Sequence, residues 1–185
     1  MAITRLGGAN AISGTIPQSN IANASLGAVT ALPAGVGGKV LQVVTQGVTE
    51  STGTTSIPQD NTLPQSNEGT EIVSINITPA STSNKILIIA NYQLSNSAND
   101  TYQRGALFRG TTCIDVNQEC IQYSNAGLIF SHHVYDQPNS TSQQTYSIRV
   151  GAHQATWYAG SIYNNNFGTP TGGNRITLME IAGWL

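Results

Sequence analysis

The feature that most constrains the fold is a series of short β-type runs, separated by turn residues, that follows the first 38 residues. Between Glu71 and Thr78, the apolar residues Val73, Ile75 and Ile77 alternate with polar residues. A period of two places apolar side chains on one face of a half-buried strand. The run Lys85 to Leu94 is instead almost continuously apolar, which is typical of a central strand in a sandwich.

The same reasoning predicts about nine strands and no strong helix. The expected strands are Val40–Val44, Glu71–Thr78, Lys85–Leu94, Gln103–Phe108, Thr112–Val116, Gly127–Tyr135, Thr145–Val150, Thr156–Ile162 and Arg175–Ile181. This number of antiparallel strands predicts an all-β jelly-roll β-sandwich, with an immunoglobulin-type sandwich as the alternative. The segment Thr49 to Asn67 lacks periodicity and is predicted to be a long surface loop.

The first 38 residues differ from the rest of the chain. Their only charged residue is Arg5, and glycine and proline interrupt any long regular element. A short helix from about Asn20 to Leu32 is an alternative for part of this segment. Disordered tails are usually rich in charge and poor in Ile and Leu. We therefore expect an extended N-terminal anchoring arm, residues 1–38, on a jelly-roll β-domain, residues 39–185. The candidate anchoring side chains are Ile3, Leu6, Ile12, Ile16, Ile21 and Leu26.

Charged residues make up only 9% of the chain, against about 25% in an ordinary soluble domain. Ser, Thr, Asn and Gln fill 68 of the 185 positions, so hydroxyls and amides must solvate the surface. Such a surface suits the packing of many copies, because packing like charges together costs energy. The net charge of −2 and the scattered Lys and Arg residues argue against nucleic-acid binding, which needs clustered cations.

No apolar run in the sequence is long enough to cross a membrane, since the longest is of strand length. The N-terminus also lacks the compact apolar core of a signal peptide. We therefore expect a protein made in a cytoplasm, without membrane insertion.

Histidine and cysteine form no metal-binding pattern in the sequence. On a strand, His132 and His133 point to opposite faces, so they cannot chelate one metal together. In a trimer, an inward histidine would be able to form a ring on the symmetry axis. Cys113 and Cys120 are spaced to face each other across a hairpin, but two free thiols are expected in a reducing cytoplasm. We expect no bound metal and no cofactor.

The sequence contains residue types that are used in catalysis, but no motif that groups them into a catalytic site. Cys113, His132 and Asp136 have no nucleophile-elbow or protease signature around them. Asp115 and Glu119 are the best pair of carboxylates for glycoside cleavage, and nothing in their spacing supports it. The sequence therefore predicts a protein that is not an enzyme.

Several segments, in order along the chain, carry a resemblance to a known family. They are Gly14–Pro17, Asn20–Gly27, Lys39–Val44, Ile77–Ile88, Leu107–Gly110, Asp136–Thr141, Tyr146–Val150 and Ile176–Ile181. Together they resemble virion proteins of aquatic bacteriophages, including cyanophages, that are described as tail-fibre-like or capsid-decoration proteins. The loop Thr49 to Asn67 departs from that family, in which it is more regular.

The resemblance implies a homotrimeric virion protein whose jelly-roll knob is similar to C1q/TNF-type heads. The arm is short, and the chain has no coiled-coil or collagen-like repeat for a fibre shaft. A capsid decoration or cement protein that binds the major capsid protein is therefore favoured. The alternative is a tail fibre or tail-tip protein that recognises host surface glycan through tyrosine and tryptophan side chains.

Overall fold

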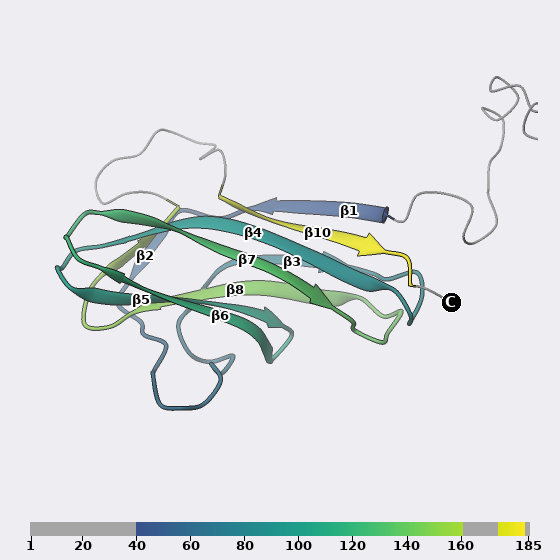
Figure 1. The fold of residues 1–185 in the computed structure, drawn as a ribbon, viewed down its shortest axis with the longest axis horizontal. Helices are drawn as coiled ribbons and strands as arrows, with labels where there is room; N and C mark the ends of the chain where they lie inside the picture. Colours follow the sequence, from purple (N-terminus) through teal and green to yellow (C-terminus); the bar gives the residue numbers. More distant parts are fainter. Residues whose placement is uncertain (1–39, 161–173, 184–185) are drawn as a thin grey trace, which may run out of the picture. The chain divides into compact units, whose positions relative to one another are not determined.

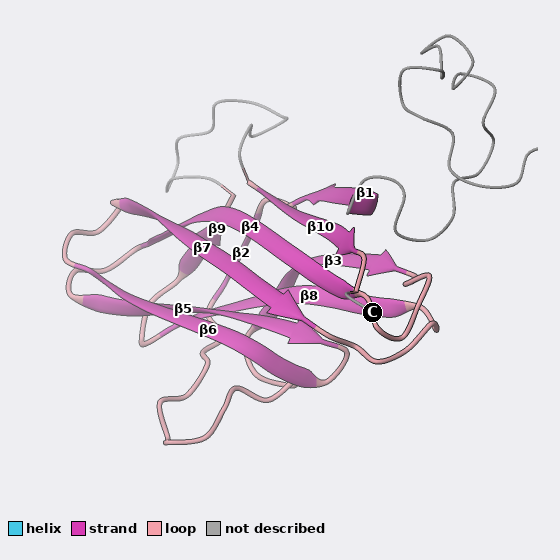
Figure 2. Cartoon of the chain, turned by 45° about the vertical axis from the view of Figure 1, so that its right-hand side comes forward, coloured by secondary structure: helices cyan, strands magenta, loops and turns pink. Residues whose placement is uncertain are grey.

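The computed structural model describes residues 40–160 and 174–183, and within these ranges every regular element is a β-strand (Figure 2). The strands are β1 Val40–Gly47, β2 Ser51–Gly53, β3 Thr70–Ile77, β4 Lys85–Asn96, β5 Thr101–Arg109, β6 Thr112–Ile121, β7 Gly127–Asp136, β8 Gln144–Ala152, β9 Trp157–Ala159 and β10 Arg175–Ile181. In this part of the chain no helix is long and apolar enough to span a membrane.

The strands form two antiparallel sheets that pack face to face (Figure 1). Sheet A has the order β1-β10-β4-β7, and the short strands β9 and β2 extend it beside β4. Sheet B has the order β3-β8-β5-β6. The eight long strands thus make two four-stranded sheets, as in a jelly roll. The predicted all-β, antiparallel sandwich is confirmed.

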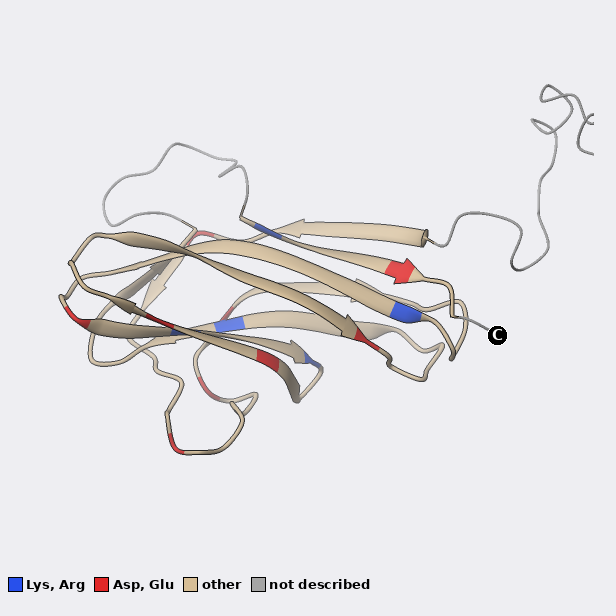
Figure 3. Cartoon of the chain, viewed as in Figure 1, with Lys and Arg blue, Asp and Glu red and all other residues tan. Residues whose placement is uncertain are grey.

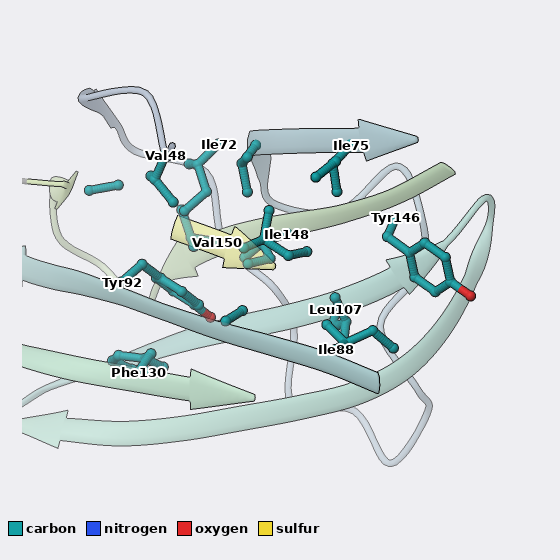
Figure 4. Close-up of a cluster of buried hydrophobic side chains, with 14 of the residues drawn as sticks. Val48, Ile72, Ile75, Ile88, Tyr92, Leu107, Phe130, Tyr146, Ile148 and Val150 are labelled. Atoms are coloured by element: carbon teal, nitrogen blue, oxygen red, sulfur yellow. The ribbon is translucent and has the colours of Figure 1, made fainter. Parts of the chain in front are cut away.

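The core lies between the sheets and consists of the inward residues of both (Figure 4). Tyr92 and Phe130 come from sheet A, and their rings stack with centroids 5.7 Å apart. Leu107, Ile148 and Val150 face them from sheet B and are fully buried. Aliphatic residues from β3, β4 and β10 fill the rest of the space, so the period-two pattern of the sequence is satisfied on the inner face of both sheets.

All nine predicted strands overlap observed strands, and most observed strands are longer than predicted. The loop prediction for 49–67 is wrong in two respects. It contains strand β2, which pairs with β9, and it buries Ile57. Both contacts are made with residues far away in the chain, so no local sequence pattern predicts them. The predicted arm, with its six anchoring residues, lies outside the described residues and stays a prediction.

Residues 54–69 cross the outer face of sheet B. Ile57 packs there against Ala106 and Phe108, and these three side chains are almost completely buried. Gly151 lets the segment approach the sheet, since a Cβ at this glycine would lie 2.6 Å from the backbone nitrogen of Ile57. Arg149 holds the end of the segment by donating to the carbonyl oxygens of residues 68 and 69. The outer face of sheet B is therefore partly covered by the chain itself.

Candidate functional site

The outer face of sheet A presents aligned rows of side chains across four strands, and one of these rows is apolar throughout. The register places Val43, Met179, Leu87 and Tyr135 side by side in one row. The next outward row combines two threonines with Ile89 and His133, and Ile129 lies further along β7. Because side chains alternate between the two faces of a strand, all of these point away from the core. We call this surface the outer A face; it also includes Ile181, Thr45 and Thr177.

Several of these side chains are unusually exposed for their type. Ile129 is 71% exposed, Tyr135 is 66% exposed and Val43 is 53% exposed. Among the described residues no segment crosses this face as residues 54–69 cross sheet B. Contiguous exposed apolar surface on a folded domain usually marks an interaction site.

The sequence of β4 supports the same interpretation. Its continuous apolar run is the pattern of a strand buried on both faces. The inward residues Ile86, Ile88 and Leu94 are completely buried, whereas the outward Leu87 and Ile89 are only partly covered. The outward apolar residues of β4 are thus confined to Leu87 and Ile89, with Leu87 in the same row as the exposed Val43 and Tyr135, while the outward Asn91 and Gln93 are polar.

Charges are few on the domain and do not gather on any one face (Figure 3). On the outer A face, Lys85 lies at one end of β4, and Arg175 begins β10 in register with Asn91, between the row of Ile89 and that of Ile129. No carboxylate belongs to these rows, since the carboxylate of β10, Glu180, points inward and is 1% exposed. The centre of the surface is thus suited to an apolar contact rather than to recognition of a charged ligand.

A buried polar chain lies near the edge strands β6 and β7. His132 is fully buried, and its Nδ1 lies 2.7 Å from Oδ2 of Asp115 while its Nε2 lies 2.9 Å from Oη of Tyr92. The carboxylate requires a donor at Nδ1, and the tyrosine hydroxyl donates to an unprotonated Nε2. These partners define a neutral imidazole with its proton on Nδ1.

The pKa values of His132 and Tyr92 agree with a neutral imidazole that carries its proton on Nδ1. Burial lowers the pKa of His132 below its usual 6.5, although the hydrogen bond to Asp115 opposes the shift. Burial also raises the pKa of Tyr92, with a smaller contribution from the charge of Asp115, so its hydroxyl keeps its proton as a donor. These hydrogen bonds join β4, β6 and β7, and the thiol of Cys113 donates to the backbone carbonyl oxygen of Asp115 at 3.5 Å rather than to His132.

The neutral state of His132 has a consequence for stability. Its folded pKa is lower than its unfolded pKa, so the unfolded chain binds a proton first as the pH falls. We expect the urea midpoint to decrease as the pH drops below about 6.5, down to the folded pKa. His132→Gln should flatten this dependence. His133→Gln, at the exposed neighbour, should preserve it. An unchanged pH profile in His132→Gln would contradict the assignment.

The structure separates the residues that the sequence suggested for chemistry. His132 faces the core and His133 faces solvent, as predicted, so an inward histidine ring on a trimer axis is ruled out for His132. Cys113 and Cys120 are free thiols on one strand, β6. The prediction of two free thiols is confirmed, and the alternative of a hairpin between them is excluded because β6 runs continuously from Thr112 to Ile121.

The catalytic combinations do not form. Asp136 binds Arg109 instead of His132, with both carboxylate oxygens 2.7 Å from one guanidinium nitrogen. Asp115 contacts His132, whereas Glu119 is exposed elsewhere on the strand. Across the described ranges, no group of three or more His, Cys, Asp or Glu residues is arranged to hold a metal ion.

No known protein family and no curated protein matches the chain. Similar solved structures include the infectious bursal disease virus VP2 subviral particle, at 12% identity and a TM-score of 0.40, over 77% of this chain and 38% of that one. The structure of the infectious bursal disease virus Gx strain gives 10% identity and 0.40, over 76% and 37%. The insecticidal delta-endotoxin Cry8Ea1 from Bacillus thuringiensis gives 15% and 0.39, over 64% and 19%. The chain spans less than two fifths of each, and likenesses this weak say nothing about function.

Proposed function

We propose that this chain is a structural protein of a bacteriophage particle, a homotrimeric capsid decoration or cement protein, and not an enzyme. The observation that carries the proposal is the outer A face, an apolar surface that no described segment covers. Copies of the same chain are its proposed occupants. The poverty of charge supports this, because identical copies meet without bringing many like charges together.

In this proposal the β-domain associates through the outer A face, and the N-terminal arm binds neighbouring capsid subunits. The six apolar arm residues, Ile3, Leu6, Ile12, Ile16, Ile21 and Leu26, supply the contact with the particle. The exposed surface of the assembly is then the outer face of sheet B, with its crossing segment. A tail fibre or tail-tip protein that binds host glycan is the alternative.

The assembly surface can be tested with single substitutions at exposed positions. Ile129→Asp places a carboxylate in the proposed contact, and an unpaired buried charge costs about 3 kcal/mol or more. We expect light scattering after size exclusion to show a trimer for the wild type. The variant should dissociate at least about a hundredfold more readily. Val116→Asp is the matched control, because Val116 is a 38% exposed apolar residue on sheet B. A monomeric wild type, or a trimeric Ile129→Asp, would contradict the proposal.

Deleting residues 1–20 tests the role of the arm separately from the role of the outer A face. If the arm binds the particle, the truncated chain remains a trimer but no longer sediments with capsids that lack the protein. Loss of the trimer on deletion would instead show that the arm is needed for assembly and would contradict the division of roles proposed here. Unchanged capsid binding would exclude the decoration role proposed for the arm.

A further inference from the structure

A pocket of about 310 Å³ opens on the outer face of sheet B, beside the segment that crosses it. Two of its walls come from strand β5 and from the crossing segment, and a third from the chain just after β8. The lining residues are Ser56, Ile57, Pro58, Gln59, Tyr102, Arg104 and His153. Its volume is at the lower end of the range of about 300–1,000 Å³ that is usual for small-molecule pockets.

Arg104 contributes a nearly buried guanidinium to this pocket, with only 7% of the residue exposed. Its Nε donates to Oε1 of Gln118 at 2.6 Å, and one terminal nitrogen donates to the carbonyl oxygen of Ile57 at 2.7 Å. The other terminal nitrogen donates to Oε1 of Gln59 at 3.1 Å. All three acceptors are neutral, and a guanidinium carries five N–H groups. These contacts therefore leave both its charge and part of its donor capacity uncompensated.

No Asp or Glu side chain compensates this charge. All nine Asp and Glu residues lie within the described ranges, and none is within ion-pair distance of Arg104. Arg109, on the same strand, differs from Arg104, because an ion pair with Asp136 at 2.7 Å neutralises its charge. Keeping a guanidinium buried without an anion costs free energy, which an anionic ligand would recover. Arginine binds carboxylates well because its planar donors match the two carboxylate oxygens.

The other walls of the pocket suit a sugar ring. Tyr102 is 43% exposed and presents an aromatic ring on the same face of β5 as Arg104. Gln59, Ser56 and His153 add an amide, a hydroxyl and an imidazole within the same lining. An aromatic surface with a polar rim is suited to the mixed apolar and hydroxylated faces of a sugar.

We propose that this pocket binds one acidic sugar unit, a uronic acid, with its carboxylate on Arg104 and its ring against Tyr102. A carboxylate from a protein side chain is the competing occupant, and the test below distinguishes it. Binding of an acidic sugar does not require the trimer or a place on a virion, so this inference and the proposed function fail or succeed separately.

The test is a titration of the full-length protein with D-glucuronate, followed by ligand-observed NMR and calorimetry, with D-glucose as the neutral control. We expect a dissociation constant of about 1 mM for glucuronate, typical of weak single-site binding, and at least about tenfold weaker binding of glucose. Equal binding of the two sugars, or no binding of glucuronate at about 20 mM, would overturn the proposal. A protein-derived occupant would be indicated if the pocket binds a short Asp- or Glu-containing peptide but not glucuronate.

Two substitutions locate the binding. Arg104→Gln removes the charge and should abolish the preference for glucuronate over glucose. Tyr102→Ala should weaken glucuronate binding at least about tenfold by removing the ring contact. Tyr123→Ala is the matched control, since Tyr123 is 71% exposed and lies outside the pocket. If Arg104→Gln does not fold, Tyr102→Ala still decides, because its side chain is half exposed; undiminished binding in Tyr102→Ala would overturn the assignment.

Discussion

Replacing Glu180 with alanine is expected to cost about 4 kcal/mol of folding stability, since hydrogen bonds to charged groups contribute about 1.5–3 kcal/mol each. Glu180 is buried on β10 and accepts three hydrogen bonds. The donors are the backbone nitrogen of Ala80 at 2.7 Å, Nδ2 of Asn84 at 2.5 Å and Nε2 of Gln42 at 2.6 Å. Alanine leaves these donors without their acceptor. Asn84 also binds the backbone nitrogen of Gly183, so the loss extends to the end of the last strand.

Urea unfolding followed by tryptophan fluorescence measures this loss, with the buried Trp157 as the reporter. The stability of Glu180→Gln should lie between those of the wild type and Glu180→Ala, because glutamine keeps one acceptor oxygen but turns an NH₂ group toward a donor. Glu71→Ala, at an exposed position of β3, should change stability by less than about 0.5 kcal/mol. A Glu180→Ala variant as stable as Glu71→Ala would show that the three donors find other partners.

Replacing Gly105 with alanine is expected to destabilise the fold by about 3 kcal/mol, at the upper end of overpacking penalties. A Cβ at this position of sheet B would lie 1.8 Å from the hydroxyl oxygen of Tyr92, which also contacts His132 within sheet A. Tyr92→Phe removes that oxygen, and the nearest remaining atom of the ring would lie 2.9 Å away. The alanine substitution should therefore cost less in the phenylalanine background.

A double-mutant cycle at these two positions checks the close approach directly. Tyr92→Phe alone should cost about 1–2 kcal/mol, because it removes one buried hydrogen bond and leaves Nε2 of His132 without its donor. The cycle should give a coupling of at least about 1 kcal/mol, with the pair more stable than the sum of the single effects predicts. Gly110→Ala tests a different effect: its φ of 56° makes alanine strained, yet no side chain lies nearby for Tyr92→Phe to relieve. Additive effects of Gly105→Ala and Tyr92→Phe would contradict the packing described above.

Hydropathy periodicity was sufficient to predict the class of fold and the position of nine strands. It succeeded because the inward residues alternate strictly with residues of the opposite face along β10, and along β3 from Val73 onward. It missed β2 and the burial of Ile57, since those depend on the room that Gly53 and Gly151 leave for residues about a hundred positions away in the chain. Pairings at such separations leave no local signal.

The candidate site was only partly visible in the sequence. The continuous apolar run of β4 indicated burial on both faces, but the sequence did not show that one of these faces would be left uncovered by the domain. The alignment of Val43, Met179, Leu87 and Tyr135 depends on the register of four strands taken from distant parts of the chain. The sequence also did not show that Arg104 lacks an acidic partner, because the positions of the nine Asp and Glu side chains depend on the fold.

The position of charge around the outer A face determines how copies joined through it would respond to their surroundings. Its apolar row contains no carboxylate, Lys85 lies in the neighbouring row, and Arg175 lies two rows away on the other side. Dissolved salt weakens contacts between charges but does not weaken apolar burial, so a contact of this kind persists in both fresh water and brine. Apolar contacts weaken on cooling, however. Temperature, rather than salinity, would then set how firmly the copies hold together.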